Sequence, residues 1–202
     1  MWRQYAMRRI LQAMTHRTKR VLIILTCITI LLVIGSLAIR NNPRATAQLS
    51  EHAPGTYSIN HFVDGDTIAV NMNGAVEKVR FIGVDTPETH KPNTPVQCYG
   101  PAAASYTASM IGHQRVRLVA DSLSTDRDRY SRLLRYVYLP DGTNLNEQLI
   151  KTGHAFYYPY FPFSSSDSFA SDQATAKADG LGLWSSCTPT PTDAGGYVSN
   201  NA

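Results

Sequence analysis

Apolar and polar residues alternate along five stretches of the chain, which is the pattern of β-strands that bury one face. The stretches are residues 57–63, 67–72, 75–84, 115–121 and 133–139. The first two are separated by the Asp-Gly of VDGDT and form one bent strand or two. Asn73 and Gly74 separate the second from the third, and Asn-Gly is the strongest short signal of a β-hairpin. The pattern therefore predicts about five strands, mostly joined as a meander.

Three further segments have helical patterns and end at glycine, a common residue at the C-terminal end of a helix. They are Gly100–Gly112, with a proline in its first turn, Asn144–Gly153 and Asp167–Gly180. Five short strands close best as a small barrel. We therefore predict an α+β domain, mainly β, built as a five-stranded OB-fold barrel with three helices. A three-layer α+β domain and a half-open roll are the alternatives.

The N-terminal part differs, because Val21–Ile39 is an unbroken apolar run without a charge. At about 1.5 Å per residue, a helix of this length can cross a bilayer. The basic residues before it predict that the N-terminus stays in the cytoplasm and that the rest lies outside. We expect a retained signal anchor in the cell membrane. The alternative is a signal peptide cleaved near Ala45–Ala47, which would make the protein secreted.

These patterns divide the chain into five parts. Residues 1–20 form a basic cytoplasmic segment, residues 21–39 a transmembrane helix and residues 40–54 a polar linker. Residues 55–187 form the folded domain. Residues 188–202 contain proline, glycine and small polar residues with little to bury, and we expect them to be a disordered tail. We expect the protein to be a monomer.

The formal net charge of +4 would by itself favour a nucleic-acid partner. The charge is unevenly distributed, however. Residues 1–44 carry eight basic and no acidic residues, whereas residues 51–187 carry fourteen acidic and eleven basic ones. The net charge therefore describes the N-terminal segment and says little about what the folded domain binds.

Carboxylates gather at one end of the predicted hairpin. Asp66 begins its first strand and Asp85 ends its second, and antiparallel pairing brings these two ends together. Neighbouring carboxylates repel each other unless a positive charge lies between them, and a hard cation such as Ca²⁺ or Mg²⁺ would supply that charge. The alternative is that Asp64 and Asp85 are turn residues whose side chains accept backbone hydrogen bonds.

Other charged residues near the hairpin suit the hydrolysis of a phosphodiester. Glu88 follows Asp85 by three residues in a proline-stiffened loop and could activate a water as a general base. Arg80 lies in the second strand of the hairpin, and Arg132 lies in the loop before the last strand. Guanidinium groups bind phosphate oxygens in pairs, and with a cation they neutralise charge that grows in the transition state.

The alternative for each arginine is an ion pair on the surface. It applies best to Arg127 and Arg129, which alternate with aspartates in the sequence DRDR. We expect these two arginines to be surface residues without a role in the site.

On these residues the chain resembles the staphylococcal nuclease (thermonuclease) family of calcium-dependent OB-fold nucleases. The similarity runs from about Thr56 to Trp184. It rests on the segments DGDT, VRFIGVDTPET, YGPAA, DRYSRLLRYVY, LNEQLIKTG and GLW, in the family's order and near its spacing. The first segment alone is weak, but the set is specific.

The resemblance implies the ligands of a calcium ion. Asp66, Asp85 and the carbonyl of Thr86 would bind it, and Asp64 would lie close to the ion without being a direct ligand. We expect Ca²⁺ rather than Mg²⁺, because carboxylate, carbonyl and water oxygens on a hairpin end and a loop form a flexible set that suits calcium better than a strict octahedron.

The resemblance also implies the roles of the remaining site residues. Glu88 would activate the attacking water, and Arg80 and Arg132 would hold the phosphate. Tyr130 would lie beside a DNA or RNA substrate.

Two features depart from the family's pattern. Ser131 stands where a glycine is expected before the clamp arginine, which leaves the placement of that loop open. Residues 154–166 are unusually rich in aromatic residues and proline. One of Tyr157, Tyr158 and Tyr160 contacts a nucleotide base or phosphate, or the segment is only a packed loop over the barrel.

Three functions remain in competition on the sequence. The complete ionic set favours a nuclease that acts outside the cytoplasm. The alternatives are a non-catalytic extracytoplasmic OB-fold module that binds nucleic acid or a partner, and a calcium-dependent phosphodiesterase for another substrate. The sequence does not distinguish DNA from RNA or endo- from exo-cleavage.

Cys98 and Cys187 are the only cysteines of the folded domain. A domain outside the cytoplasm meets oxidising conditions, in which paired cysteines form disulfides. We therefore predict a Cys98–Cys187 disulfide that fastens the end of the domain to the barrel. Two free thiols are the alternative.

Overall fold

The structure, a computed structural model, describes residues 25–29, 55–90, 94–193 and 195–202. Among these residues no helix has both the length and the apolar composition needed to cross a membrane. The predicted transmembrane helix, apart from residues 25–29, and the linker at 40–54 lie outside the described residues. The chain divides into two units, and all of the described strands belong to the unit Ala53–Ala202.

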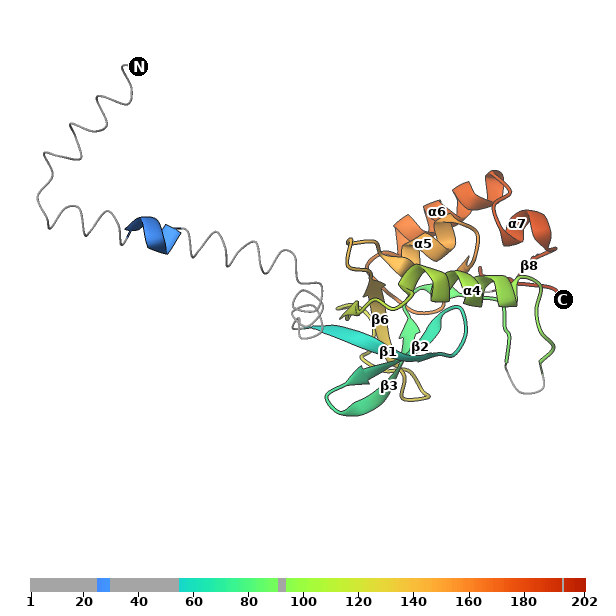
Figure 1. Cartoon of the computed structure of the whole chain (residues 1–202). Coiled ribbons are helices and arrows are strands. Elements are labelled where there is room, and N and C mark those ends of the chain that lie inside the picture. The colour runs from blue at the N-terminus through green and yellow to red at the C-terminus, as the bar shows by residue number, and fades with distance from the viewer. Residues whose placement is uncertain (1–24, 30–54, 91–93, 194) are drawn as a thin grey trace, which may run out of the picture. The chain divides into compact units, whose positions relative to one another are not determined.

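Five strands of this unit close into a barrel with the order β1-β2-β3-β6-β5 (Figure 1). They are β1 (Thr56–Phe62), β2 (Thr67–Met72), β3 (Ala75–Phe81), β5 (Val116–Val119) and β6 (Leu133–Tyr138). The predicted five-stranded barrel is confirmed. One pairing differs from a meander, because β3 and β6 run parallel, with Val79 opposite Leu133.

The hairpin of β2 and β3 turns at Asn73 and Gly74, as predicted. Both residues have positive φ angles, 51° and 83°, which two-residue hairpin turns of type I′ require. The pairing places Thr67 opposite Arg80, and the Phe81 N–H donates to the Asp66 carbonyl at 2.9 Å. The start of β2 therefore lies beside the end of β3.

Four helices lie together on one side of the barrel (Figure 1). They are α4 (Gly100–Ile111), α5 (Leu145–Lys151), α6 (Ser166–Ala178) and α7 (Leu183–Ser186). The first three confirm the predicted helices, and the short α7 is additional. The barrel interior and the inner faces of the helices share one apolar core, which includes Ile68, Val79, Phe81, Leu149 and Phe169.

The third predicted strand ends earlier than expected, at Phe81. Gly83 has a φ of 72°, and a Cβ at this position would lie 2.5 Å from the Phe163 ring, so only glycine fits this bend. Beyond the bend, β4 (Val84–Asp85) leaves the barrel and pairs with β7 (Phe156–Tyr157), a strand that the sequence did not reveal. The pairing joins the aromatic segment to the chain that carries Asp85.

Asn146 connects α5 to the barrel from a fully buried position. Its amide nitrogen donates to the carbonyls of Ile82 and Arg135, at 2.9 and 3.2 Å. Its amide oxygen accepts the Val137 N–H at 2.9 Å. Burial of an amide is tolerated when its donors and acceptors are bonded, and this residue therefore fixes the exit of the chain from β3.

The predicted disorder of residues 188–202 is wrong for the described part of this segment. Here β8 (Thr190–Pro191) pairs with β9 (Tyr197–Val198). The Tyr197 ring packs on Trp184 and Phe156, with ring centroids 5.0 and 5.9 Å apart. One aromatic residue and a set of backbone hydrogen bonds therefore order a segment whose composition alone indicated a flexible tail.

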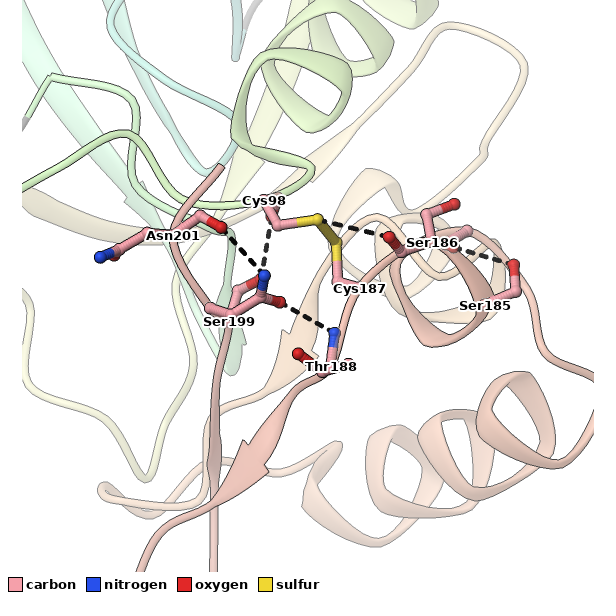
Figure 2. The surroundings of a disulfide bond; sticks show 9 residues. Cys98, Ser185, Ser186, Cys187, Thr188, Ser199 and Asn201 are labelled. Carbon is pink, nitrogen blue, oxygen red and sulfur yellow. Dashed lines mark hydrogen bonds between the residues drawn. A yellow bond between two sulfur atoms is a disulfide. The ribbon is translucent and has the colours of Figure 1, made fainter.

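The predicted disulfide between Cys98 and Cys187 is present (Figure 2). It joins residues separated by 89 positions in the sequence. Cys98 lies just before α4, and Cys187 follows α7, so the bond fastens the last helix to the start of the first.

We expect that replacing both Cys98 and Cys187 by serine lowers the free energy of unfolding by about 2–5 kcal/mol, because the unfolded chain gains the freedom of a long open loop. Chemical denaturation with circular dichroism measures the loss. Cys27, which lies outside the folded domain, provides the control substitution. A double variant as stable as the parent chain, or two free thiols in the unfolded, unreduced domain, would contradict this prediction.

Candidate active site

The turn between β1 and β2 is fixed from two sides at Gly65. The Thr107 hydroxyl of α4 donates to the Gly65 carbonyl at 2.6 Å. A Cβ at Gly65 would lie 2.8 Å from the Thr86 side chain, so glycine permits this close approach. The Asp64 carboxylate accepts the Asp66 N–H at 3.2 Å, which is the turn role considered for Asp64.

The next residue of the turn belongs to an ionic cluster around Arg80. The two terminal nitrogens of Arg80 lie 2.8 Å from Asp66 Oδ2 and 2.8 Å from Asp85 Oδ1. The Arg80 and Asp66 side chains are only 12% and 6% exposed, whereas that of Asp85 is 39% exposed. The Asp66 carboxylate also accepts the Thr86 N–H at 2.8 Å and the Thr67 hydroxyl at 2.9 Å. The structure thus brings Asp66, Arg80, Asp85 and Thr86 together.

The cluster contains more acidic than basic groups. Burial by itself would lower the pKa of Arg80, but the charges of Asp66, Asp85 and Asp64 outweigh it and raise that pKa, so Arg80 stays charged. Burial, and then the charge of Asp66, raises the pKa of Asp64 to about 7. The site therefore has carboxylate charge that a single guanidinium does not neutralise.

The residues of the cluster fit a hard cation better than a zinc-type ion. Within the described ranges, no three histidine, cysteine, aspartate or glutamate side chains are grouped to hold a metal by themselves. The oxygens available here are the carboxylates of Asp66 and Asp85, which approach the same guanidinium, and the adjacent Thr86 carbonyl. Such a set needs water to complete a shell, as is common for Ca²⁺ and Mg²⁺.

Arg132 lies outside the Arg80 cluster and is held by a turn centred on Asp128. The Asp128 carboxylate accepts the Arg132 Nε–H at 2.7 Å and the backbone N–H groups of Arg132 and Tyr130, each at 2.9 Å. Burial raises the pKa of Asp128, but these hydrogen bonds outweigh it and lower the pKa below its ordinary value. Sequence analysis did not single out Asp128, although its spacing of four residues from Arg132 was visible.

Ser131 adopts the backbone conformation of the glycine that it replaces. Its φ is 65°, and its N–H donates to the Asp128 carbonyl at 3.0 Å. Ser131 therefore takes the left-handed conformation that glycine favours, in the turn that leads into Arg132. The cost is a left-handed backbone at a residue with a Cβ, about 1–2 kcal/mol.

Arg80 and Arg132 both line one cavity of about 680 Å³. Its lining includes Arg80, Arg129, Tyr130, Arg132 and Tyr158. The guanidinium carbons of Arg129 and Arg132 lie 4.7 and 5.5 Å from the centre of the Tyr130 ring, which is itself 63% exposed. A phosphate between the arginines would thus have an aromatic face beside it.

The three candidate tyrosines differ in position, and Tyr158 is the one that lies near Arg80. Its ring centre lies 5.9 Å from the Arg80 guanidinium carbon, and burial, followed by the charge of Asp85, raises its pKa. The Tyr157 hydroxyl bonds to Ser166, and the Tyr160 hydroxyl bonds to Thr192, both at helix or tail positions. Only Tyr158 of the three lines the cavity.

The two arginines expected to be surface residues differ. Arg127 forms the predicted ion pair, with Glu77 at 2.8 Å. For Arg129, by contrast, the described residues include no ion-pair partner, and its contact is the Tyr130 ring at the cavity. Both side chains are exposed and both line the cavity, so the surface position is confirmed for both arginines, and among the described residues the predicted ion pair is found for Arg127 alone.

Glu88 lies in the loop that begins after Asp85 and is not among the residues that line the cavity. Its backbone is paired with Gln97: the Glu88 N–H donates to the Gln97 side-chain oxygen at 2.8 Å, and the Gln97 N–H donates to the Glu88 carbonyl at 2.9 Å. The position of its backbone is thus fixed by a residue that sequence analysis did not consider.

Comparison with known proteins finds one matching family and several similar proteins. The family described as "Staphylococcal nuclease homologue" matches residues 78–186, which include Arg80, Asp85, Glu88 and Arg132. The thermonuclease of Staphylococcus hyicus is 43% identical over 138 residues, which are 66% of this chain and 79% of that protein.

Two other relatives are matched over a smaller share of their length. The thermonuclease of Staphylococcus intermedius is 48% identical over 106 residues, 52% of this chain and 61% of that protein. Endonuclease YncB of Bacillus subtilis is 40% identical over 145 residues, 71% of this chain and 64% of that protein. The chain is therefore homologous to thermonucleases and endonucleases, which are phosphodiester hydrolases.

We expect Ser131→Gly to raise the free energy of unfolding by up to about 1 kcal/mol, because relief of the left-handed strain exceeds the added flexibility of the unfolded chain. Ser131→Val should lower it, since a β-branched residue is least compatible with φ of 65°. Thermal unfolding of the two variants beside the parent measures both changes. Equal stability of the glycine and valine variants would show that this backbone conformation is not required.

Proposed function

Because the chain belongs to the staphylococcal nuclease family, we propose that its ionic cluster hydrolyses phosphodiester bonds of DNA, RNA or both. The observation that carries the proposal is the convergence of Asp66 and Asp85 on Arg80, which lines one cavity together with Arg132. The strand order of the barrel supports an OB-type fold, in which loops between strands commonly bind nucleic acids.

Arg80 and Arg132 act as the phosphate clamp in this proposal. Each guanidinium has part of its donor set fixed by a carboxylate, Arg80 by Asp66 and Asp85 and Arg132 by Asp128. Fixed donors stabilise the charge that develops on the phosphate oxygens without having to reorganise during the reaction. Tyr130 and Tyr158 offer aromatic faces to the neighbouring bases.

Asp66, Asp85 and the Thr86 carbonyl would hold Ca²⁺. When bound, the ion would neutralise negative charge on the phosphate and on the attacking oxygen. Asp64 adds negative charge near this position without serving as a ligand. The buried, hydrogen-bonded Asp66 provides the fixed part of the set, and the more exposed Asp85 provides the adjustable part.

Glu88 is the general base of the proposal. It would take a proton from the attacking water, in line with its place three residues after Asp85 in a loop fixed by Gln97. The leaving oxygen of the phosphodiester departs opposite the attacking water.

The reaction takes place outside the cytoplasm, in our proposal, with residues 21–39 as the membrane anchor and with release by cleavage as the alternative. The disulfide supports an oxidising location. Protease added to intact cells should therefore remove the domain, and complete protection inside the cells would refute this topology.

A direct test incubates the purified chain with plasmid DNA and with single-stranded RNA, with Ca²⁺, with Mg²⁺ or with excess chelator. We expect cleavage with Ca²⁺ and none in chelator, while circular dichroism stays unchanged because the barrel core does not involve the ion. Full activity in chelator would refute the metal site. Binding without cleavage under every condition would favour the non-catalytic module instead.

We expect Glu88→Gln to lower kcat by about 10²–10⁴-fold with substrate binding largely kept, the usual loss for a general base. Arg132→Lys should lower kcat by about 10²–10³-fold, because a point charge cannot replace the bidentate fork. Arg129→Ala should act mainly on KM, since Arg129 lines the cavity beside Tyr130.

Matched controls are available away from the cavity. Arg117→Lys changes an exposed arginine of β5, and Glu147→Gln changes one half of an exposed ion pair with Lys151. Both should leave kcat near the parental value. If Glu88→Gln weakened binding as much as it slowed cleavage, the role of Glu88 would be structural.

A further inference from the structure

Residues 96–98 form the middle of a short hydrogen-bonded ladder between Glu88 and residues 200–202, which are called the outer strand below. On one side, Gln97 bonds to the N–H and to the carbonyl of Glu88, as described above. On the other side, the Cys98 N–H donates to the Asn200 carbonyl at 2.7 Å, and the Ala202 N–H donates to the Val96 carbonyl at 2.9 Å. Gln97 and Asn201 face each other between these two bonds. A single segment, residues 96–98, therefore lies between residues 200–202 and Glu88.

The outer strand of this ladder is anchored where it begins. Ser199 is buried, with 4% of its surface exposed, and its hydroxyl donates to the Cys98 carbonyl at 2.9 Å. The Asn200 side-chain oxygen accepts the Thr188 N–H at 2.8 Å. Figure 2 shows these contacts around the Cys98–Cys187 disulfide. The start of the outer strand is thus bonded to Cys98 through Ser199 and to Thr188, beside Cys187, through Asn200.

We propose that residues 200–202 position the catalytic Glu88 through Gln97, an inference that rests on the proposed role of Glu88. A general base must lie within hydrogen-bond reach of its water, and a displacement of about 1 Å can cost on the order of 10²-fold in rate. The phosphate clamp is held by other contacts, those of Arg80 and Arg132 with their aspartates. The outer strand therefore serves turnover rather than substrate affinity.

The test compares the full chain with a chain that ends at Ser199 and so keeps the disulfide, the β8–β9 hairpin and the Ser199 bond. We expect kcat on a DNA oligonucleotide to fall by about 10–100-fold, with KM nearly unchanged. In a Glu88→Gln background the same truncation should have no further effect, because the residual reaction does not use the base. Independent, additive losses in the two backgrounds would overturn the inference.

A second readout does not depend on activity. Hydrogen exchange at the amides of Glu88 and Gln97 should be faster in the truncated chain. Gln97→Ala removes the acceptor of the Glu88 N–H and should reproduce the fall in kcat, whereas Gln97→Glu keeps an oxygen there and should restore it. Gln114→Ala, at an exposed glutamine after α4, is the matched control and should change neither quantity.

The outcomes separate this inference from the proposed function. Unchanged exchange and unchanged kcat in the truncated chain would overturn the positioning role while the nuclease activity stands. A full chain that cleaves no nucleic acid would refute the proposed function, and with it the catalytic part of the inference. Faster exchange at Glu88 in that case would still show that residues 200–202 hold the loop.

Discussion

The buried guanidinium of Arg80 is the constraint on which the rest of the site depends. A charge removed from water is tolerated only with close partners of opposite sign and complete hydrogen bonding. Its partners come from two places, Asp66 before β2 and Asp85 after the bend at Gly83. The β2–β3 pairing, the close approach of Gly65 to Thr86 and the pairing of β4 with β7 must all hold for both carboxylates to reach it. The contacts that stabilise the fold are therefore the same contacts that bring the charged groups of the site together.

The second arginine shows a different solution to the same problem. Arg132 is oriented within one turn, by Asp128 four residues before it and by the left-handed backbone of Ser131. This arrangement is local and partly exposed, so it depends little on the barrel. The Arg80 guanidinium is thus fixed by contacts between distant segments, and the Arg132 guanidinium is fixed by its own turn. The two arginines that line the cavity are therefore held in different ways.

Residues 200–202 complete this picture, because the described residues that follow Asp85, 86–90 and 94–96, belong to no helix or strand. Its bonds to Gln97 and the outer strand of residues 200–202 replace the sheet that a barrel residue would have. Residues distant in sequence thereby hold the backbone at Glu88, and the disulfide joins the segment of Cys98 to the C-terminal one.

The sequence by itself determined the elements that depend on neighbouring residues. Apolar alternation predicted the barrel strands, glycine stops predicted three helices, and Asn73-Gly74 predicted the hairpin that brings Asp66 towards Asp85. The presence of only two cysteines in the domain, together with the expected location outside the cytoplasm, was enough to predict the disulfide. The first three signals act over a few neighbouring residues. The disulfide could be predicted because each domain cysteine has only one other cysteine in the domain to pair with.

Only the tertiary structure decided the features that depend on contacts between distant segments. The parallel pairing of β3 with β6, the bend at Gly83 enforced by Phe163, and the choice of Tyr158 among three tyrosines are of this kind. So are the buried amide of Asn146 and the order of residues 188–193 and 195–202, whose polar composition indicated disorder. Their order comes from backbone hydrogen bonds and from the two aromatic contacts of Tyr197, with Trp184 and Phe156. Composition cannot show such bonds, because every residue type except proline has the same backbone donor and acceptor.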